Sequence, residues 1–177
     1  MGICVQDILT TLNSWAAPEL AADWDNNGLQ LGNVTNEVQS ILIALEIDCH
    51  VLAELRANPV DLVITHHPLI FKALKTIDTS TDIGQIIQLL FTKNINHIAA
   101  HTNLDAAEGG VNDTLIEHFG LSATAGTSFP DGFGKYFTLN NELEFSQLTQ
   151  AFKSQIQGSS STRPVTKLAV CAGSGKS

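Results

Sequence analysis

ILIALEIDCHVLAELRANPVDLVIT, at residues 41–65, is the stretch of sequence from which the fold follows. Its first part, Ile41–Ile47, is a short apolar run rich in β-branched residues, which predicts a buried strand. His50–Ala57 then carries apolar residues at helical spacing, and Val60–Thr65 is a second apolar run of strand length. The stretch therefore predicts a strand, a helix and a second strand that lies parallel to the first.

The same alternation extends to both sides of this stretch. An amphipathic helix is predicted over residues 4–15, before Pro18, because apolar residues recur there at helical spacing. Further on, the pattern predicts a helix at Ile83–Phe91, a strand at Ile95–Ala100 and a helix at Val111–Phe119 that Gly120 closes. We therefore expect an α/β fold, with a mostly parallel or mixed sheet built from successive βαβ units and helices on both faces.

The last third of the chain shows a second pattern. After a Gly/Ser/Thr/Pro-rich connection, strands are expected at Gly134–Leu139 and Val165–Ala172, with a helix at Glu144–Ile156 between them. We expect residues 1–121 to form a metal-site α/β domain and residues 122–177 to continue the same fold. Because the last strand is followed only by GSGKS, we expect this fold to be truncated at its C-terminal end; the alternative is that a partner subunit completes its last strand.

Composition narrows the possible partners. The chain has 177 residues, 44% of them hydrophobic, and a net charge of −9. This charge opposes nonspecific binding to nucleic acid or to an anionic membrane, so we expect no direct nucleic-acid binding and no membrane association. There is neither a spanning apolar stretch nor a secretory signal, and Cys4, Cys49 and Cys171 form no CxxC pair. We expect a cytoplasmic protein with reduced cysteines.

Two histidines follow the strand that ends at Thr65. In open α/β sheets ligands bind beyond the carboxyl ends of the strands, and His66 and His67 stand there. Neighbouring residues of a strand point to opposite faces, so both imidazoles converge only if the strand ends at His66. Pro68 favours that break, because it has no N–H to continue a ladder. The alternative is one core histidine and one surface histidine.

A second polar element follows the next predicted strand and favours a metal site. His101 and Asp105 come directly after Ile95–Ala100, and sequential βαβ strands usually lie side by side. Imidazole and carboxylate are ligands for zinc, iron, nickel and manganese, and a carboxylate bridges two ions. Glu46 and Asp48 are further candidates for this rim, whereas His97 is expected to be a buried core imidazole.

The residues also resemble a known family. WDNNGLQLG at Trp24–Gly32, DLVITHHPLIF at Asp61–Phe71, AAHTNLDAAEGGVND at Ala99–Asp113 and LAVCAGSG at Leu168–Gly175 resemble, in order and spacing, motifs of the NGG-interacting-factor-three-like family, the type-2 GTP cyclohydrolase I-like proteins. This resemblance implies an α/β protein with a dinuclear metal centre in a cleft, assembled into a ring-like homo-oligomer.

The resemblance also implies roles for individual residues. His66 and His67 match paired metal-ligand histidines and Asp105 matches a ligand carboxylate. His101 matches a site-lining histidine that coordinates metal or acts as a catalytic acid or base. Asp25, Asn26 and Gly28 match the early motif, for which we expect a role in shaping the cleft. Members of the family continue into a segment with a further His and Glu ligand, which does not occur in these 177 residues.

These observations predict a metal-dependent hydrolase that acts on a nucleotide such as GTP, or on another phosphoester, through metal-bound hydroxide. The expected cofactors are divalent ions, two per site in the complete family architecture, with zinc, iron, manganese and nickel all compatible with the ligands. The alternative is a noncatalytic metal-binding scaffold or interaction protein. A protein without any metal is the third hypothesis.

Overall fold

The structure is a computed structural model, and it describes residues 2–130, 132–152 and 162–173. The chain forms two compact units, Met1–Leu104 and Asp105–Ser177. Each unit has its own sheet, and the first unit carries the histidines that the sequence singles out.

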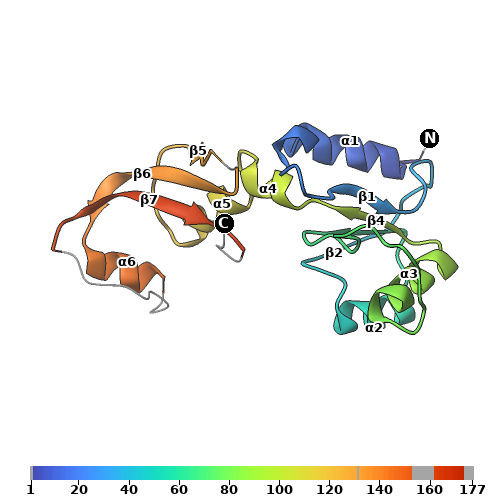
Figure 1. The fold of residues 1–177 in the computed structure, drawn as a ribbon. Coiled ribbons are helices and arrows are strands. Elements are labelled where there is room, and N and C mark those ends of the chain that lie inside the picture. Colours follow the sequence, from blue (N-terminus) through green and yellow to red (C-terminus); the bar gives the residue numbers. More distant parts are fainter. Residues whose placement is uncertain (1, 131, 153–161, 174–177) are drawn as a thin grey trace. The chain divides into compact units, whose positions relative to one another are not determined.

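The first unit is built on a four-stranded mixed sheet in the order β1-β4-β3-β2 (Figure 1). Strands β2 (Ile41–Ala44), β3 (Leu62–Thr65) and β4 (Asn96–Ala99) are parallel, as expected. Strand β1 (Gly28–Leu31), which the sequence pattern does not predict, pairs antiparallel with β4. Its direction brings the residues that precede it to the edge where the parallel strands end.

Helices cover both faces of this sheet, which confirms the expected fold class (Figure 1). Helix α1 (Val5–Trp15) packs its apolar residues against Leu62 and Ile98 on one face. Helices α2 (Cys49–Ala57) and α3 (Asp82–Thr92) close a second core on the other face, around Val63. A 3-10 turn, η1 (Pro18–Leu20), follows α1.

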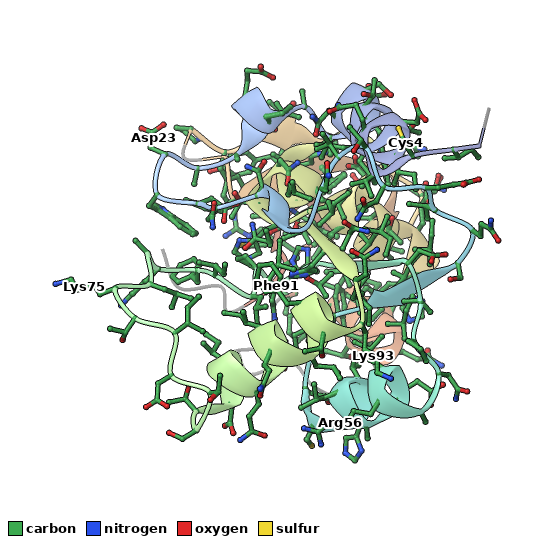
Figure 2. The ribbon with its side chains drawn as sticks, turned by 90° about the vertical axis from the view of Figure 1, so that its right-hand side faces the viewer. Cys4, Asp23, Arg56, Lys75, Phe91 and Lys93 are labelled. Carbon is green, nitrogen blue, oxygen red and sulfur yellow. The ribbon has the colours of Figure 1, made fainter. Side chains whose placement is uncertain are left out.

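Side-chain N-caps stabilise the first turns of the two helices on the second face. The Asp48 side chain accepts hydrogen bonds from the backbone N–H groups of His50 and Val51, so it caps α2 and does not line the rim. The Thr81 side chain caps α3 in the same way, through the N–H of Gly84. Charged side chains such as Arg56 and Lys75 lie at the periphery of this unit and are exposed (Figure 2).

The second unit contains a three-stranded antiparallel sheet in the order β5-β6-β7. Its elements are α5 (Val111–His118), β5 (Thr127–Ser128), β6 (Gly134–Leu143), α6 (Phe145–Ala151) and β7 (Val165–Cys171), and the short helix α4 (Thr102–Ala106) begins in the first unit. Ile116, Phe137 and Val170 form the core of this unit. Lys135 is buried there, and its Nζ donates to the carbonyl of Ala107 (2.7 Å) and to Asp113 Oδ2 (2.6 Å).

Some expected features of this unit lie outside the described residues. The predicted helix at Glu144–Ile156 is seen as α6, but residues 153–156 are not described. The same holds for most of the polar loop that follows them and for residues 174–177 of the terminal GSGKS. Within the described ranges, none of the helices has the length and apolar character needed to cross a membrane.

Candidate metal site

Three histidines meet at the carboxyl edge of the first sheet. His66 and His67 follow β3, and His101 follows the neighbouring parallel strand β4. The two strands end in register, with Thr65 paired to Ala99, so the residues that follow them leave the sheet at the same level. The adjacent histidines therefore reach one place because regular strand geometry stops at Thr65.

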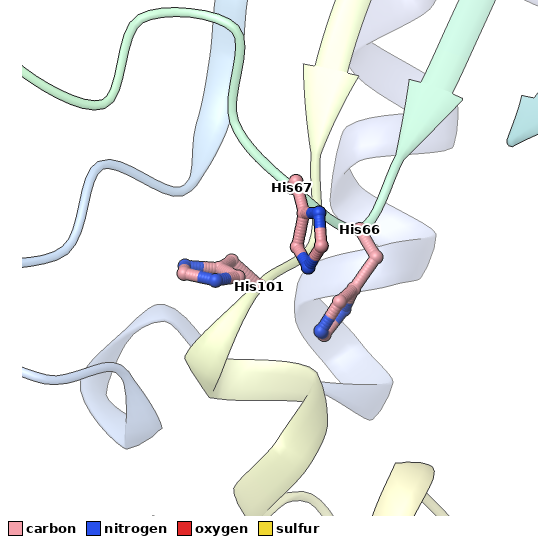
Figure 3. Close-up of side chains that lie close together, drawn as sticks. All are labelled: His66, His67 and His101. Atoms are coloured by element: carbon pink, nitrogen blue, oxygen red, sulfur yellow. The ribbon is translucent and has the colours of Figure 1, made fainter. Parts of the chain in front are cut away.

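The three imidazoles are close enough to bind one metal ion together. One ring nitrogen from each of His66, His67 and His101 lies within 4.8 Å of the others, and this trio is the group of potential metal ligands found among the described residues (Figure 3). The ring centroids are 5.2 Å apart for His66 and His67, 5.2 Å for His66 and His101, and 5.8 Å for His67 and His101.

The Nδ1 atom of each histidine is held by an acceptor. His66 Nδ1 donates to the carbonyl oxygen of Ala100 at 2.9 Å, because that oxygen can only accept. His67 Nδ1 lies 3.0 Å from Glu46 Oε2, and His101 Nδ1 lies 2.7 Å from Asp25 Oδ1. With the proton on Nδ1, Nε2 is the nitrogen of each ring that carries a lone pair. This arrangement is typical of metal-ligand histidines, whose other N–H is bound to a carboxylate or a backbone carbonyl.

Asp25 anchors His101 from the loop before β1. Its side chain is fully buried, and its Oδ2 accepts hydrogen bonds from the backbone N–H (3.1 Å) and the hydroxyl (2.5 Å) of Thr102. Burial raises the pKa of Asp25, but the hydrogen bonds from His101 and Thr102 and the attraction of His101 outweigh it and lower the pKa to about 2. Asp25 is therefore ionised at neutral pH and orients the imidazole of His101.

The same loop forms one wall of the site. The Trp24 ring stands edge-on to Phe71, with centroids 5.7 Å apart, and to His101, at 6.3 Å. Asn26 Nδ2 donates to the carbonyl of Ile70 at 2.6 Å, which ties this loop to the segment that follows the two histidines. Through these contacts the loop that carries the early motif lies beside His101.

Other candidate residues are placed as follows. Asp105, expected as a ligand, is a buried residue of α4 and the first residue of the second unit, and the histidine trio does not include it. Glu46 lies at the rim, where it accepts from His67. His50 and His118 are exposed on helices α2 and α5.

His97 is buried on β4, as expected, but only one of its ring nitrogens is paired. Its Nε2 lies 2.8 Å from the hydroxyl of Thr65, while Nδ1 has no hydrogen-bond partner among the described residues. Burial lowers the pKa of His97 to about 4, so the ring is neutral at pH 7.

The sequence did not predict how Asp25 and Thr65 act on the histidines. The hydrogen bond between Asp25 and His101 depends on the position of β1. This strand, Gly28–Leu31, has only four residues, and its pattern of apolar and polar residues is too short to be recognised from periodicity. The Thr65 hydroxyl carries no distinguishing signal in the sequence, because threonine is a common strand residue.

The donor set fits a divalent first-row ion. Neutral imidazoles suit zinc, copper, iron and nickel, and three protein ligands leave a position for water or substrate. The fold and the site together define an α/β protein with a three-histidine centre that could hold a metal ion.

The family is established by sequence. Residues 3–177 match the Duf34/NIF3 (NGG1p interacting factor 3) family, and the chain belongs to it. The chain is 35% identical over 181 residues to the GTP cyclohydrolase 1 type 2 of Helicobacter pylori, covering 98% of this chain and 70% of that protein. It is 30% identical over 183 residues to the GTP cyclohydrolase 1 type 2 homolog of Clostridium perfringens, covering 97% and 70%.

Solved structures of similar fold agree with this assignment. The reduced HcgD of Methanocaldococcus jannaschii superposes with a TM-score of 0.81 at 28% identity, covering 100% of this chain and 72% of that one. Protein SA1388 of Staphylococcus aureus gives a TM-score of 0.81 at 23% identity, covering 99% and 73%, and this likeness concerns the fold alone.

Proposed function

We propose that the chain is a metal-dependent hydrolase whose centre is held by His66, His67 and His101. The observation that carries this proposal is the hydrogen bond from each Nδ1 to an acceptor, which turns Nε2 of all three rings into a ligand atom. A bound divalent ion supplies Lewis acidity there and lowers the pKa of water toward about 7.

The chain's own residues would orient this chemistry. Glu46 and Asp25 hold the His67 and His101 rings, so little reorganisation is needed when a ligand binds. Asp25 also holds the His101 ring through Nδ1, which supports the alternative role of this ring as the catalytic acid or base that moves a proton at Nε2. Trp24 and Phe71 provide an apolar wall against which a planar group can stack.

We propose a nucleotide such as GTP, or another phosphoester, as the substrate class. GTP is supported by the names of the relatives, which are called GTP cyclohydrolase 1 type 2 or homologs of it. Phosphoesters in general are supported because divalent metal centres commonly catalyse their hydrolysis. Because the chain carries a net charge of −9, a polyphosphate needs a local cation to approach, and the centre would provide it.

Asp105 and a second ion complete the proposal. We keep Asp105 as a further ligand, together with a second divalent ion and a ring-like homo-oligomer, as the family resemblance implies. Exchange of Asp105 for Asn should then lower the number of ions bound per chain, measured by elemental analysis after equilibrium dialysis. Sedimentation of the native protein measures the oligomeric state.

The alternative is a metal-binding scaffold without turnover. It is supported by the family description, which refers to an interacting factor. Both functions share the metal centre and differ in catalysis.

The deciding experiment loads the protein separately with Mn²⁺, Fe²⁺, Zn²⁺ and Ni²⁺ and measures hydrolysis of GTP and of a generic phosphodiester. The variant His66→Ala removes a ligand, and His50→Ala removes an exposed histidine of the same unit as a matched control. The hydrolase predicts turnover that His66→Ala abolishes and His50→Ala preserves. Metal binding without turnover supports the scaffold, and turnover that survives in His66→Ala contradicts the proposed centre.

A further inference from the structure

The backbone of His67 is fixed from inside the sheet by a chain of two buried side chains. The Thr65 hydroxyl lies 2.7 Å from the carbonyl oxygen of His67 and 2.8 Å from Nε2 of His97. A carbonyl oxygen only accepts, so the single hydroxyl proton of Thr65 goes to His67. His97 must then donate its Nε2–H to Thr65, and the chain runs from His97 through Thr65 to His67.

The sheet register makes this chain of hydrogen bonds rigid. Val63 pairs with His97 and Thr65 pairs with Ala99, so His97 and Thr65 project from adjacent parallel strands on the same face. His97 and Thr65 are 0% and 1% exposed, so water does not compete for these bonds.

Thr65 also reaches the segment that carries the third histidine. Its backbone carbonyl accepts from the N–H of Ala100 at 2.9 Å, and the carbonyl of Ala100 accepts from His66 Nδ1. The N–H of His67 donates to the carbonyl of Leu45 at 2.8 Å. The Thr65 hydroxyl provides the opposite restraint, so both polar groups of the His67 backbone are tied down.

Packing alone does not account for a histidine at position 97. Its partners across the sheet are Leu31 and Val63, which belong to an apolar core. A leucine there would bury no polar atom, whereas His97 buries an Nδ1 without a hydrogen-bond partner among the described residues. Burying this unpaired nitrogen costs free energy. The presence of His97 is explained if its other ring nitrogen, Nε2, makes a hydrogen bond that the site requires.

We propose that His97 and Thr65 are positioning residues of the metal centre, which set the His67 backbone so that two consecutive histidines face one ion. This inference rests on the proposed function, because it assumes that His66 and His67 are ligands. Neither residue is proposed to touch the ion or the substrate.

The test measures Co²⁺ binding, with the dissociation constant taken from competition with a chromophoric chelator and the geometry from the visible absorption of the saturated protein. Thr65→Val removes the hydroxyl and keeps the shape, whereas Thr65→Ser keeps the hydroxyl. His97→Leu removes the donor, and His97→Gln retains an N–H. Val63→Ala is the matched control, because it weakens the same strand and core without touching the hydrogen bonds.

We expect Thr65→Val and His97→Leu to weaken Co²⁺ binding about tenfold and to change the absorption spectrum, as substitutions behind metal ligands typically do. Thr65→Ser and His97→Gln should stay closer to the wild type in both readouts. The double variant Thr65→Val/His97→Leu should bind like Thr65→Val alone, because His97 acts through Thr65. Val63→Ala should lower the unfolding midpoint and leave affinity and spectrum unchanged.

Wild-type affinity and spectrum in Thr65→Val, or additive effects in the double variant, would overturn this inference while the metal centre itself stands. Co²⁺ binding that is equally tight in His66→Ala would overturn the proposed function as well. Should Thr65→Val or His97→Leu not fold, Thr65→Ser and His97→Gln decide. Both retain a donor and should keep a spectrum close to the wild type, and a change in either spectrum as large as the change in His66→Ala contradicts the inference.

Discussion

Acidification should destabilise the folded chain through His97. Its pKa is about 4 in the folded protein, because it is buried, against an ordinary value of 6.5. Between these values the unfolded chain binds more protons than the folded chain, so the stability falls as the pH falls. The contribution is fully lost at about pH 4 and is fully retained above about pH 6.5.

The size of the effect follows from the two pKa values. At pH 4.5 the imidazole is almost fully protonated in the unfolded chain and only about one quarter protonated in the folded chain, which corresponds to a loss of about 2.5 kcal/mol of unfolding free energy relative to pH 7.5. Asp25 contributes little in this range, because its stabilisation is lost between its ordinary pKa of 3.8 and its folded pKa of about 2, and both values lie below pH 4.5.

Urea unfolding of the metal-free protein, followed by circular dichroism at about pH 7.5 and pH 4.5, measures this difference. His97→Gln is the comparison, because it retains a donor for Thr65 and does not titrate. The wild type should lose about 2.5 kcal/mol more than His97→Gln across the range. Equal pH dependence of the two proteins would falsify the assignment of a neutral, buried imidazole to position 97.

Three further predictions concern single side chains. Asp25→Asn removes the charge that orients His101 and should weaken Co²⁺ binding by about 10- to 100-fold, measured by chelator competition, with an unchanged affinity arguing against the Asp25–His101 pair. Lys135→Met leaves the Asp113 carboxylate without its buried cation and should cost about 3 kcal/mol in urea unfolding, whereas a loss below about 1 kcal/mol contradicts a buried pair. Leu55→Ala empties a fully buried core position on α2 and should cost about 2–5 kcal/mol by the same assay, and a neutral result would mean that this core is not packed as described.

The parallel part of the fold could be predicted because its signals are local. Apolar runs of strand length alternate with helical periodicity, and β2, β3, β4, α2 and α3 all appear near their expected positions. The expectation that His66 and His67 leave the sheet together also followed from local chemistry, since Pro68 ends the strand pattern.

The antiparallel strand and the contacts that depend on it could not be predicted. Strand β1 has four residues, and its pairing with β4 is made across a long sequence separation. Because that pairing places Asp25 beside His101, the buried carboxylate of the site follows from tertiary structure and not from periodicity. The resemblance to the family pointed to Asp25 but not to the hydrogen bonds that it makes.

Asp25 links the binding of a cation at His101 to the stability of the first turn of α4. One carboxylate serves the imidazole of His101 and the amide that opens α4, so a cation that orders His101 should also slow hydrogen exchange at the Thr102 amide. The coupling is reciprocal, and a substitution that frays the first turn of α4 should reduce affinity for the cation by the same factor. Local unfolding of this turn is thus a route by which the protein would release the cation proposed to bind at His101.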